Sequence, residues 1–253
     1  MTSQSWSPSN YATHANFVPN LTVDVVKLLQ PSSEWSILDL GCGDGVLTKK
    51  LEGICNKVVG VDSSPEMIEA AKQLGCQDAR VVDGHELDPA QFEEKFDAVF
   101  SNAALHWMKK DPAAVIRGVR DVLKPNGRFV GEMGGHLNCH ELHSALIHAV
   151  NKRGQNGVEL SPWFFPTVEE YAELLEANGF KVEHIELVPR ITPLPTDVGG
   201  WVRTFGGSFF KPFDRETQEE MIQEVMDFLK PVCYRQNQWS VMYVRLRFVA
   251  FRA

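Results

Sequence analysis

A glycine-rich stretch near residue 40 constrains the fold of this chain more than any other feature. Residues 38–45 read LDLGCGDG, which predicts a buried strand that runs through a tight turn into a helix. Glycines at such a turn let a ligand approach backbone N–H groups at the helix N-terminus. A dinucleotide fingerprint, Gly-x-Gly-x-x-Gly, would place its third glycine where this chain has Val46, and no lysine follows as in a P-loop. The turn therefore argues against a nicotinamide cofactor or ATP; a tight turn that binds no ligand is the alternative.

Short apolar strands alternate with amphipathic helices on both sides of this turn. Strands are predicted at residues 36–40, 57–61, 79–83, 97–101, 128–133, 181–188 and 241–251. Helices are predicted before the first strand, after Ser64, after Asp111, after Thr167 and after Asp214, where capping residues precede apolar positions at helical spacing. Strand, helix and strand at this cadence indicate an α/β fold with right-handed parallel crossovers.

Acidic residues end two of the predicted strands. Asp62 lies 21 residues after Gly41, where a carboxylate can accept hydrogen bonds from both hydroxyls of a ribose. Asp83 ends the next strand and can accept from an exocyclic amine. Because the carboxyl ends of parallel strands meet at one edge of a sheet, these acids and the glycine turn predict one crevice. Its ligand is expected to be a nucleoside without phosphates.

Charge and cysteine content limit the function classes. The 253 residues carry a formal net charge of −8, which argues against a surface that binds nucleic acid. No stretch approaches 18 consecutive apolar residues, and the first residues do not resemble a secretory signal. Five widely spaced cysteines without a Cys-x-x-Cys pair favour reduced thiols over a disulfide framework. We therefore expect a cytoplasmic protein that binds neither nucleic acid nor membrane, as a monomer or homodimer.

The sequence resembles a known family through LDLGCGDG, the two acidic strand ends and SNAALHW at 101–107. These motifs are similar to those of class I S-adenosylmethionine-dependent methyltransferases, and among them to small-molecule enzymes around trans-aconitate methyltransferase and malonyl-carrier O-methyltransferase. The resemblance implies a Rossmann-like sheet of seven mostly parallel strands with helices on both faces. Its last strand is antiparallel and inserted between the fifth and sixth. A single domain over 1–253 is expected, with an entry segment (1–30), a cofactor-binding core (31–133) and a helical substrate lid (134–166 and 189–240).

The resemblance also implies roles for individual residues around S-adenosylmethionine. Gly41 and Gly43 lie behind the methionine part of the cofactor, Asp62 binds the ribose, and the Asn102 backbone faces the methionine amino group. The remaining implied contacts are Ser63 and Met67 beside the adenine, Asp83, Gly84 and His85 at the adenine edge, and Tyr11 closing over the cofactor. Asp39 is expected to brace the glycine turn rather than to touch the ligand.

Candidate residues for the acceptor side follow from chemistry and position. A carboxylate acceptor needs no base, whereas a hydroxyl or amine does, and His106 and His136 are the candidate bases. A hydrogen-bonded wall histidine is the alternative for each. Trp107, Trp163 and Trp201 are candidate substrate walls, with lid core as the alternative. Arg203 or Arg245 could bind an acidic substrate, with an ion pair to a protein acid as the alternative.

No metal site is expected. His136, Cys139, His140 and His143 lie close in sequence, but their spacing does not match a standard zinc pattern.

The function predicted from these residues is methyl transfer to a small-molecule acceptor, favouring an oxygen of a carboxylate or hydroxyl. Methylation of nitrogen or sulfur in a small metabolite, and a non-catalytic cofactor-binding regulator, are the alternatives.

Overall fold

The computed structural model describes residues 23–253, and these divide into two compact units. The sheet unit comprises 23–136, 163–188 and 245–253; the helical unit comprises 137–162 and 189–244. The long strands β6 and β8 have residues in both units. The predicted lid segments fall within a few residues of the helical unit, and that they cover a site stays a prediction. Tyr11 lies outside the described residues.

The sheet unit holds the parallel strands, and their bounds follow the predicted ones closely. Its strands are β1 Ser36–Leu40, β2 Lys57–Asp62, β3 Ala79–Val81, β4 Phe96–Asn102, β5 Leu123–Gly134, and parts of β6 Phe180–Pro193 and β8 Gln238–Arg252. Its helices are α2 Val23–Leu29, α3 Val46–Glu52, α4 Pro65–Gln73, α5 Pro112–Val122 and α8 Val168–Ala177, with short 3₁₀ turns η2 Gly84–Glu86, η3 Pro89–Gln91 and η4 Leu105–Trp107.

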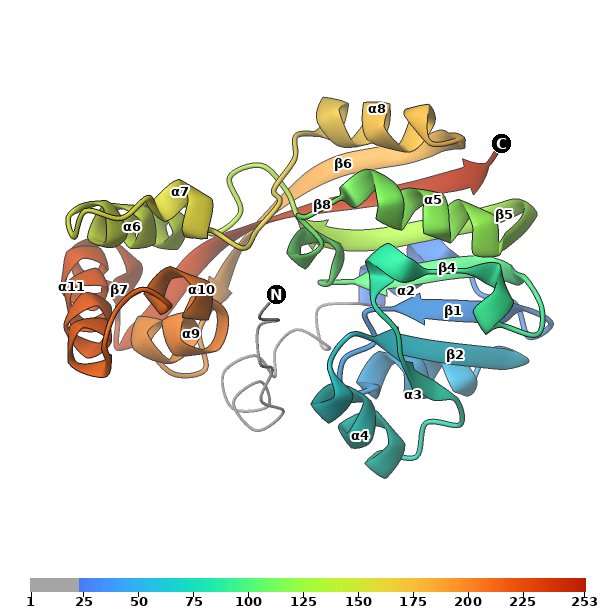
Figure 1. Cartoon of the computed structure of the whole chain (residues 1–253), viewed down its shortest axis with the longest axis horizontal. Helices are drawn as coiled ribbons and strands as arrows, with labels where there is room; N and C mark the ends of the chain where they lie inside the picture. Colours follow the sequence, from blue (N-terminus) through green and yellow to red (C-terminus); the bar gives the residue numbers. More distant parts are fainter. Residues whose placement is uncertain (1–22) are drawn as a thin grey trace. The chain divides into compact units, whose positions relative to one another are not determined.

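The strand order is β3-β2-β1-β4-β5-β8-β6, with a small strand β7 paired to β8 outside this path (Figure 1). β1 to β5 pair in parallel, and β8 pairs antiparallel with β5, Gly134 lying opposite Arg245. The prediction of a mostly parallel sheet, with an antiparallel last strand between the fifth and sixth long strands, is confirmed.

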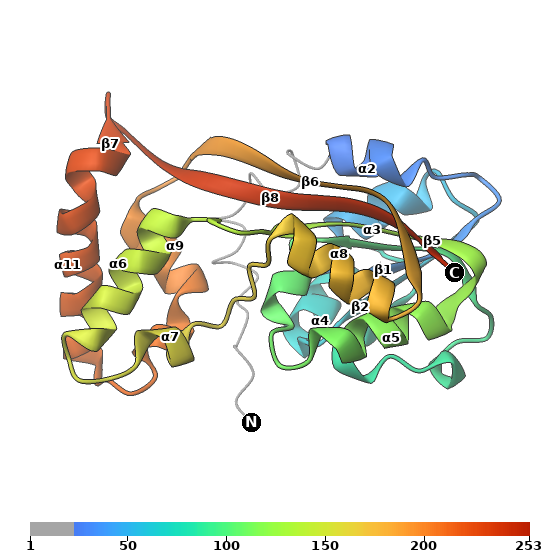
Figure 2. The same cartoon turned by 90° about the horizontal axis from the view of Figure 1, so that it is seen from above.

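Helices cover both faces of the sheet, as Figure 2 shows with α2 and α3 on one side and α5 and α8 on the other. The α2/α3 face is built around Val25, Leu29, Ile37, Phe100 and Val130, all fully buried. The opposite face is built from α5 and α8 side chains packed on the alternate residues of the same strands. A strand that is apolar on both faces needs such double cover, which explains the missing alternation in its sequence.

Two predicted strand bounds were wrong for identifiable reasons. The third strand ends at Val81 and not at Asp83, because the Asp83 carboxylate accepts from the His85 N–H at 2.9 Å and caps the η2 turn. The fifth strand begins at Leu123, earlier than predicted, because Leu123 pairs with Phe96; residues 125–127, predicted to end a helix, lie within the strand, with Asn126 at a φ of +58°. β6 also runs past its predicted end at residue 188 to Pro193, and β8 begins at Gln238, before its predicted start at residue 241. Several strand lengths therefore changed, and the topology did not.

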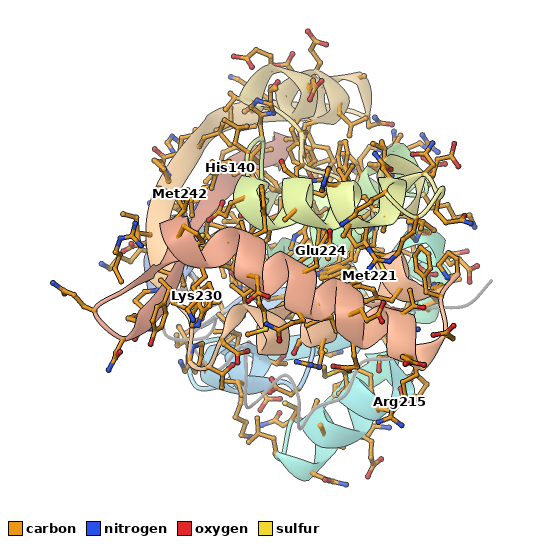
Figure 3. The ribbon with its side chains drawn as sticks, turned by 90° about the vertical axis from the view of Figure 1, so that its left-hand side faces the viewer. His140, Arg215, Met221, Glu224, Lys230 and Met242 are labelled. Carbon is orange, nitrogen blue, oxygen red and sulfur yellow. The ribbon has the colours of Figure 1, made fainter. Side chains whose placement is uncertain are left out.

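The helical unit contains α6 His140–Asn151, α7 Gly157–Leu160, α9 Val198–Phe205, α10 Gly207–Phe210, α11 Arg215–Cys233 and β7 Tyr234–Arg235. Asp214 caps α11 as predicted, accepting from the Thr217 N–H at 2.8 Å. Glu224 lies on the side of α11 that faces α6 (Figure 3), where Lys152 and Arg153 donate to its carboxylate at 2.7 and 3.0 Å. These charge-assisted bonds tie the two helices together.

Candidate functional site

The glycine turn is the first part of the site, and its geometry requires glycine at Gly41. Gly41 has a φ of +75°, and a Cβ built on it would lie 2.2 Å from the Cβ of Ala104. Ala104 reaches this position because Ala103 takes a left-handed conformation, with a φ of +57°. The Ser101 hydroxyl also donates to the Leu40 carbonyl at 2.7 Å. The predicted SNAALHW segment and the glycine turn are therefore in direct contact.

Gly43 differs from Gly41 in its surroundings. Its φ is +56°, but a Cβ at this position would meet no atom within 4 Å. The Gly43 N–H donates to one carboxylate oxygen of Asp62 at 3.0 Å, and the Ser64 N–H donates to the other at 2.9 Å. The Asp62 carboxylate is thus held against the glycine turn, with lone pairs left on each oxygen for a further donor. Burial raises the pKa of Asp62, and these backbone hydrogen bonds oppose that rise.

Asp39 braces the turn from inside the protein. Its side chain is fully buried, and its carboxyl accepts from the Thr48 hydroxyl at 2.7 Å, which links β1 to α3. Burial raises the pKa of Asp39 to about 7; the Thr48 hydrogen bond opposes the rise and the charge of Asp62 adds to it. This placement supports the expected bracing role.

The residues predicted around an adenine lie at the ends of β2 and β3. Ser63 is exposed, Met67 is buried on α4, and Ser64, not Ser63, caps that helix by accepting from the Met67 N–H at 3.2 Å. Asp83 and His85 form a pair: Nδ1 of the His85 ring lies 2.7 Å from Oδ1 of Asp83. Although burial raises the pKa of Asp83, hydrogen bonds and charge from His85 outweigh it and leave the pKa lowered.

Two buried polar atoms at this edge of the sheet lack a partner. Nε2 of His85 and Oδ1 of Asn102 make no hydrogen bond to any part of the chain that the structure describes. Unpaired buried polar atoms are costly, and a bound ligand relieves that cost.

Met108 also belongs to the site, although the sequence did not single it out. A Cβ added to Gly84 would lie 2.9 Å from the Met108 sulfur. The small residue at position 84 therefore makes room for Met108. Met108 lies two residues after His106, a candidate site residue, and this proximity was the signal available in the sequence.

His106 lies in an aromatic cluster at the end of β4. The cluster contains His106, Trp107, Trp163 and Phe165, with ring centroids 5.4 to 5.9 Å apart. Nδ1 of His106 accepts from the Gly134 N–H at 3.3 Å. Burial and the positive charge of Arg245 hold the pKa of His106 well below its ordinary value, so its ring is neutral and carries its proton on Nε2. This arrangement is that of a hydrogen-bonded wall histidine.

The remaining acceptor-side candidates belong to both units. His136 is exposed, and its N–H donates to the Pro166 carbonyl at 2.8 Å. In the helical unit, Trp201 is buried and donates from Nε1 to the Tyr243 hydroxyl at 2.7 Å. Arg203 is half exposed and forms an ion pair with Glu219 at 2.5 Å, which is the alternative set out for it. The structure therefore brings Trp107, Trp163 and His106 together in one unit and leaves Trp201 and Arg203 in the other.

Arg245, named from the sequence as a candidate for an acidic substrate or an ion pair, lies in a network of charged side chains inside β5 and β8 whose other members, Glu132 and Arg247, the sequence did not single out. Glu132 is buried and accepts from Nε of Arg247 at 2.6 Å, while Nε of Arg245 lies 3.8 Å from its other oxygen. Both arginines are less than one-tenth exposed. The alternation of charged and apolar residues in YVRLRFVAFR was the available signal.

Neither a metal centre nor a membrane span is found among the residues that the structure describes. Residues 23–253 contain no group of three or more His, Cys, Asp or Glu side chains that could hold a metal ion. None of the helices in this part of the chain is long and apolar enough to cross a membrane. None of the five cysteines forms a disulfide, and all five are buried.

Comparison with known proteins identifies the family. Residues 38–131 match the model of a methyltransferase domain. An uncharacterised methyltransferase of Schizosaccharomyces pombe is 41% identical over 98% of this chain and 98% of its own length. A malonyl-[acyl-carrier protein] O-methyltransferase of Priestia megaterium is 30% identical over 57% of this chain and 53% of that protein. A trans-aconitate 2-methyltransferase of Mycolicibacterium gilvum is 36% identical over 44% of this chain and 43% of that protein.

Solved structures agree with this fold. A putative methyltransferase from Bacillus halodurans superposes with a TM-score of 0.61 at 17% identity, covering 90% of this chain and 98% of that one. A phosphoethanolamine N-methyltransferase of Haemonchus contortus, solved with S-adenosylhomocysteine, gives a TM-score of 0.56 at 19% identity over 92% of this chain and 52% of that one. From the matching domain, the near full-length relative and the shared fold, this chain belongs to the S-adenosylmethionine-dependent methyltransferases.

Proposed function

We propose that this methyltransferase transfers a methyl group to an oxygen, of a carboxylate or a hydroxyl, in a small-molecule acceptor. The observation that carries the methyl-transfer part of this proposal is the arrangement at the carboxyl ends of β1, β2 and β4. There the Gly43 N–H binds Asp62, and Asn102 carries an unpaired buried oxygen. The malonyl-carrier and trans-aconitate enzymes among the relatives are named for small-molecule or carrier-bound acceptors, which supports the class of acceptor.

The residues of this crevice fit S-adenosylmethionine. The open space beside Gly43 leaves room for a ligand against the backbone, where a side chain would intrude. The Asp62 carboxylate has lone pairs for ribose hydroxyls, and Asp83, with its lowered pKa, is an ionised acceptor for an exocyclic amine. We assign Gly41, Gly43 and Asn102 to the methionine part, Asp62 to the ribose, and the Ser63, Met67, Asp83, Gly84 and His85 group to the adenine.

The bound cofactor supplies a methyl group on a positively charged sulfur. Transfer would be an in-line displacement in which an acceptor oxygen forms the new bond to carbon as the bond to sulfur breaks. A carboxylate acceptor has no proton to lose, whereas a hydroxyl acceptor would pass its proton to a base, for which His136 is the remaining candidate. Such a step depends on alignment at near-attack distance and on exclusion of water. The aromatic cluster of His106, Trp107, Trp163 and Phe165 provides apolar surface for both purposes. His106 holds its proton on Nε2 and serves as a wall and donor rather than as a base.

The cofactor part is tested by replacing Asp62 with Ala and measuring S-adenosylhomocysteine binding by calorimetry. We expect at least a tenfold loss of affinity, about 1.4 kcal/mol, because both ribose acceptors and the partner of the Gly43 N–H are removed. Asp88→Ala is the matched control, because Asp88 is a carboxylate that caps the η3 turn, and its loss is expected to leave the affinity unchanged. Equal affinity in wild type and Asp62→Ala would contradict the assignment.

The reaction is tested by mass spectrometry of products formed from a pooled set of small acids, phenols and amines. A product heavier by one methylene, with the methyl group on oxygen, supports the proposal. A methyl group on nitrogen or sulfur would contradict an oxygen acceptor and would favour the alternative acceptor atoms. Saturable cofactor binding without any methylated product would favour a cofactor-binding regulator.

A further inference from the structure

The side chain of Met108 is close to both turns that we assign to the cofactor. A Cβ built on Gly84, at the start of η2, would lie 2.9 Å from its sulfur and 3.0 Å from its terminal methyl carbon. A Cβ built on Gly41, in the glycine turn, would lie 4.0 Å from the same methyl carbon. One side chain is therefore near the turn assigned to the methionine part and near the turn assigned to the adenine.

Packing, and not backbone conformation, explains the glycine at position 84. Gly84 does not have a positive φ, so its backbone conformation is open to any L-residue. After the two Met108 atoms, the nearest atom to the built Cβ is Cδ1 of Leu40, at 3.3 Å. A side chain at position 84 would therefore first displace the end of Met108, which is flexible because its chain is unbranched.

The backbone of Met108 is held by the turn that carries part of the aromatic cluster. The Met108 N–H donates to the Leu105 carbonyl at 3.0 Å and ends η4. The same turn begins after Ala104, the residue that approaches Gly41. The Met108 side chain also packs against the core on the α5 and α8 face of the sheet, which includes Leu40. Met108 thus reaches the two cofactor turns from a backbone that η4 holds in place.

From these contacts we propose that Met108 is a positioning residue for the cofactor. Its side chain keeps the η2 turn at the distance from the glycine turn that a ligand spanning both turns requires. The inference rests on the proposed function, which assigns one turn to the methionine part and the other to the adenine. Without this side chain each turn keeps its own hydrogen bonds, but the distance between the turns is no longer fixed. A ligand that spans both turns then loses affinity, whereas a ligand confined to the adenine side does not.

The test compares two ligands by calorimetry. S-adenosylhomocysteine spans both turns in the proposed site, whereas 5′-methylthioadenosine lacks the amino-acid part. Each ligand is titrated into wild type, Met108→Ala, Met108→Leu and the control Met226→Ala. Met226 lies in the helical unit, and a Cβ built on Gly199 would lie 2.7 Å from its sulfur. The control therefore removes the same kind of glycine–methionine packing among residues that carry no cofactor assignment.

We expect Met108→Ala to weaken S-adenosylhomocysteine at least fivefold and 5′-methylthioadenosine less than twofold. The ratio of the two affinities separates a spacing role from a general loss of packing, which would weaken both ligands alike. Met108→Leu should recover most of the loss, because leucine has a similar apolar volume. Met226→Ala should bind both ligands as wild type does.

A double-mutant cycle tests whether position 84 acts through Met108. Gly84→Ala in otherwise wild-type protein should weaken S-adenosylhomocysteine at least fivefold, because the added methyl group displaces the end of Met108. In the Met108→Ala background the same substitution should change the affinity less than twofold, because the space is then free.

Equal losses of both ligands in Met108→Ala, or no loss of either, would overturn the proposal. A Gly84→Ala effect of the same size in both backgrounds would also overturn it. Met108→Val, which shortens the side chain but keeps apolar bulk, supplies the ligand comparison if Met108→Ala fails to fold. Wild type that binds neither ligand would instead refute the proposed function.

Discussion

Replacing Asp39 with Asn tests the electrostatics of the glycine turn through the pH dependence of stability. Asp39 is buried, its carboxyl accepts from Thr48, and its pKa is raised to about 7 from an ordinary 3.8. Between pH 4 and 7 the folded protein therefore keeps a proton at Asp39 that the unfolded chain has released. The free energy of unfolding must then fall as the pH rises through this window and become level above pH 7.

The size of the effect follows from the pKa difference. Each tenfold change in an ionisation constant is worth about 1.4 kcal/mol, so a rise from 3.8 to about 7 corresponds to about 4 kcal/mol. The amide oxygen of the Asp39→Asn variant would still accept from Thr48, but the amide does not titrate. Burying this amide group adds a cost of about 1–3 kcal/mol that is the same at every pH. Wild type should therefore lose about 4 kcal/mol relative to Asp39→Asn between pH 4 and 8.

The assay is urea unfolding of both proteins at half-unit pH steps, compared as a difference at each pH. Taking the difference removes the other carboxyls, such as Asp83, whose lowered pKa makes stability rise with pH. Two curves that stay parallel from pH 4 to 8 would show that the Asp39 pKa is not raised and would refute the reasoning.

Two further predictions concern the turn and the aromatic cluster. Gly41→Ala combines a φ of +75° with a 2.2 Å contact to Ala104, and should cost about 3 kcal/mol or more in urea unfolding. Gly75→Ala, at a φ of +90° with no atom within 4 Å, should cost only about 1–2 kcal/mol, and equal losses would contradict the clash. His106→Gln should keep the methyl-transfer rate within about tenfold, because a glutamine can accept from the Gly134 N–H in place of Nδ1. The wild-type rate should show no titration of His106 between pH 6.5 and 8, and a loss of a hundredfold or more in the variant would instead identify a base.

Local patterns predicted the sheet well because each signal was complete within a short stretch. The glycine turn, the cap at Asp214 and the apolar strand 36–40 needed no distant residue to define them, and each occurs where it was predicted. Asp83 shows the limit of such patterns. The strand was predicted to reach Asp83, but the Asp83 carboxylate accepts from the His85 N–H and caps η2. Whether a side chain or a neighbouring strand binds a backbone N–H depends on the three-dimensional arrangement, which a local pattern does not contain.

The acceptor side was less predictable because it depends on pairings between strands far apart in sequence. Glu132 and Arg247 meet only once β8 is inserted beside β5, a contact over 115 residues. For Arg203 the sequence left open whether it binds an acidic substrate or a protein acid, and the structure pairs it with Glu219, 16 residues later. The partner of a charged residue is therefore set by the fold, whereas the role of a turn glycine or a helix cap can be predicted from its neighbours in the sequence.

The close approach of Gly41 to Ala104 joins two segments that lie far apart in the sequence. One segment is the glycine turn that we assign to the cofactor, and the other carries His106 and Trp107. Because a Cβ on Gly41 would lie 2.2 Å from the Cβ of Ala104, a side chain at position 41 would have to push the second segment away. A larger residue at position 41 would therefore call for a compensating change in the segment that carries His106 and Trp107.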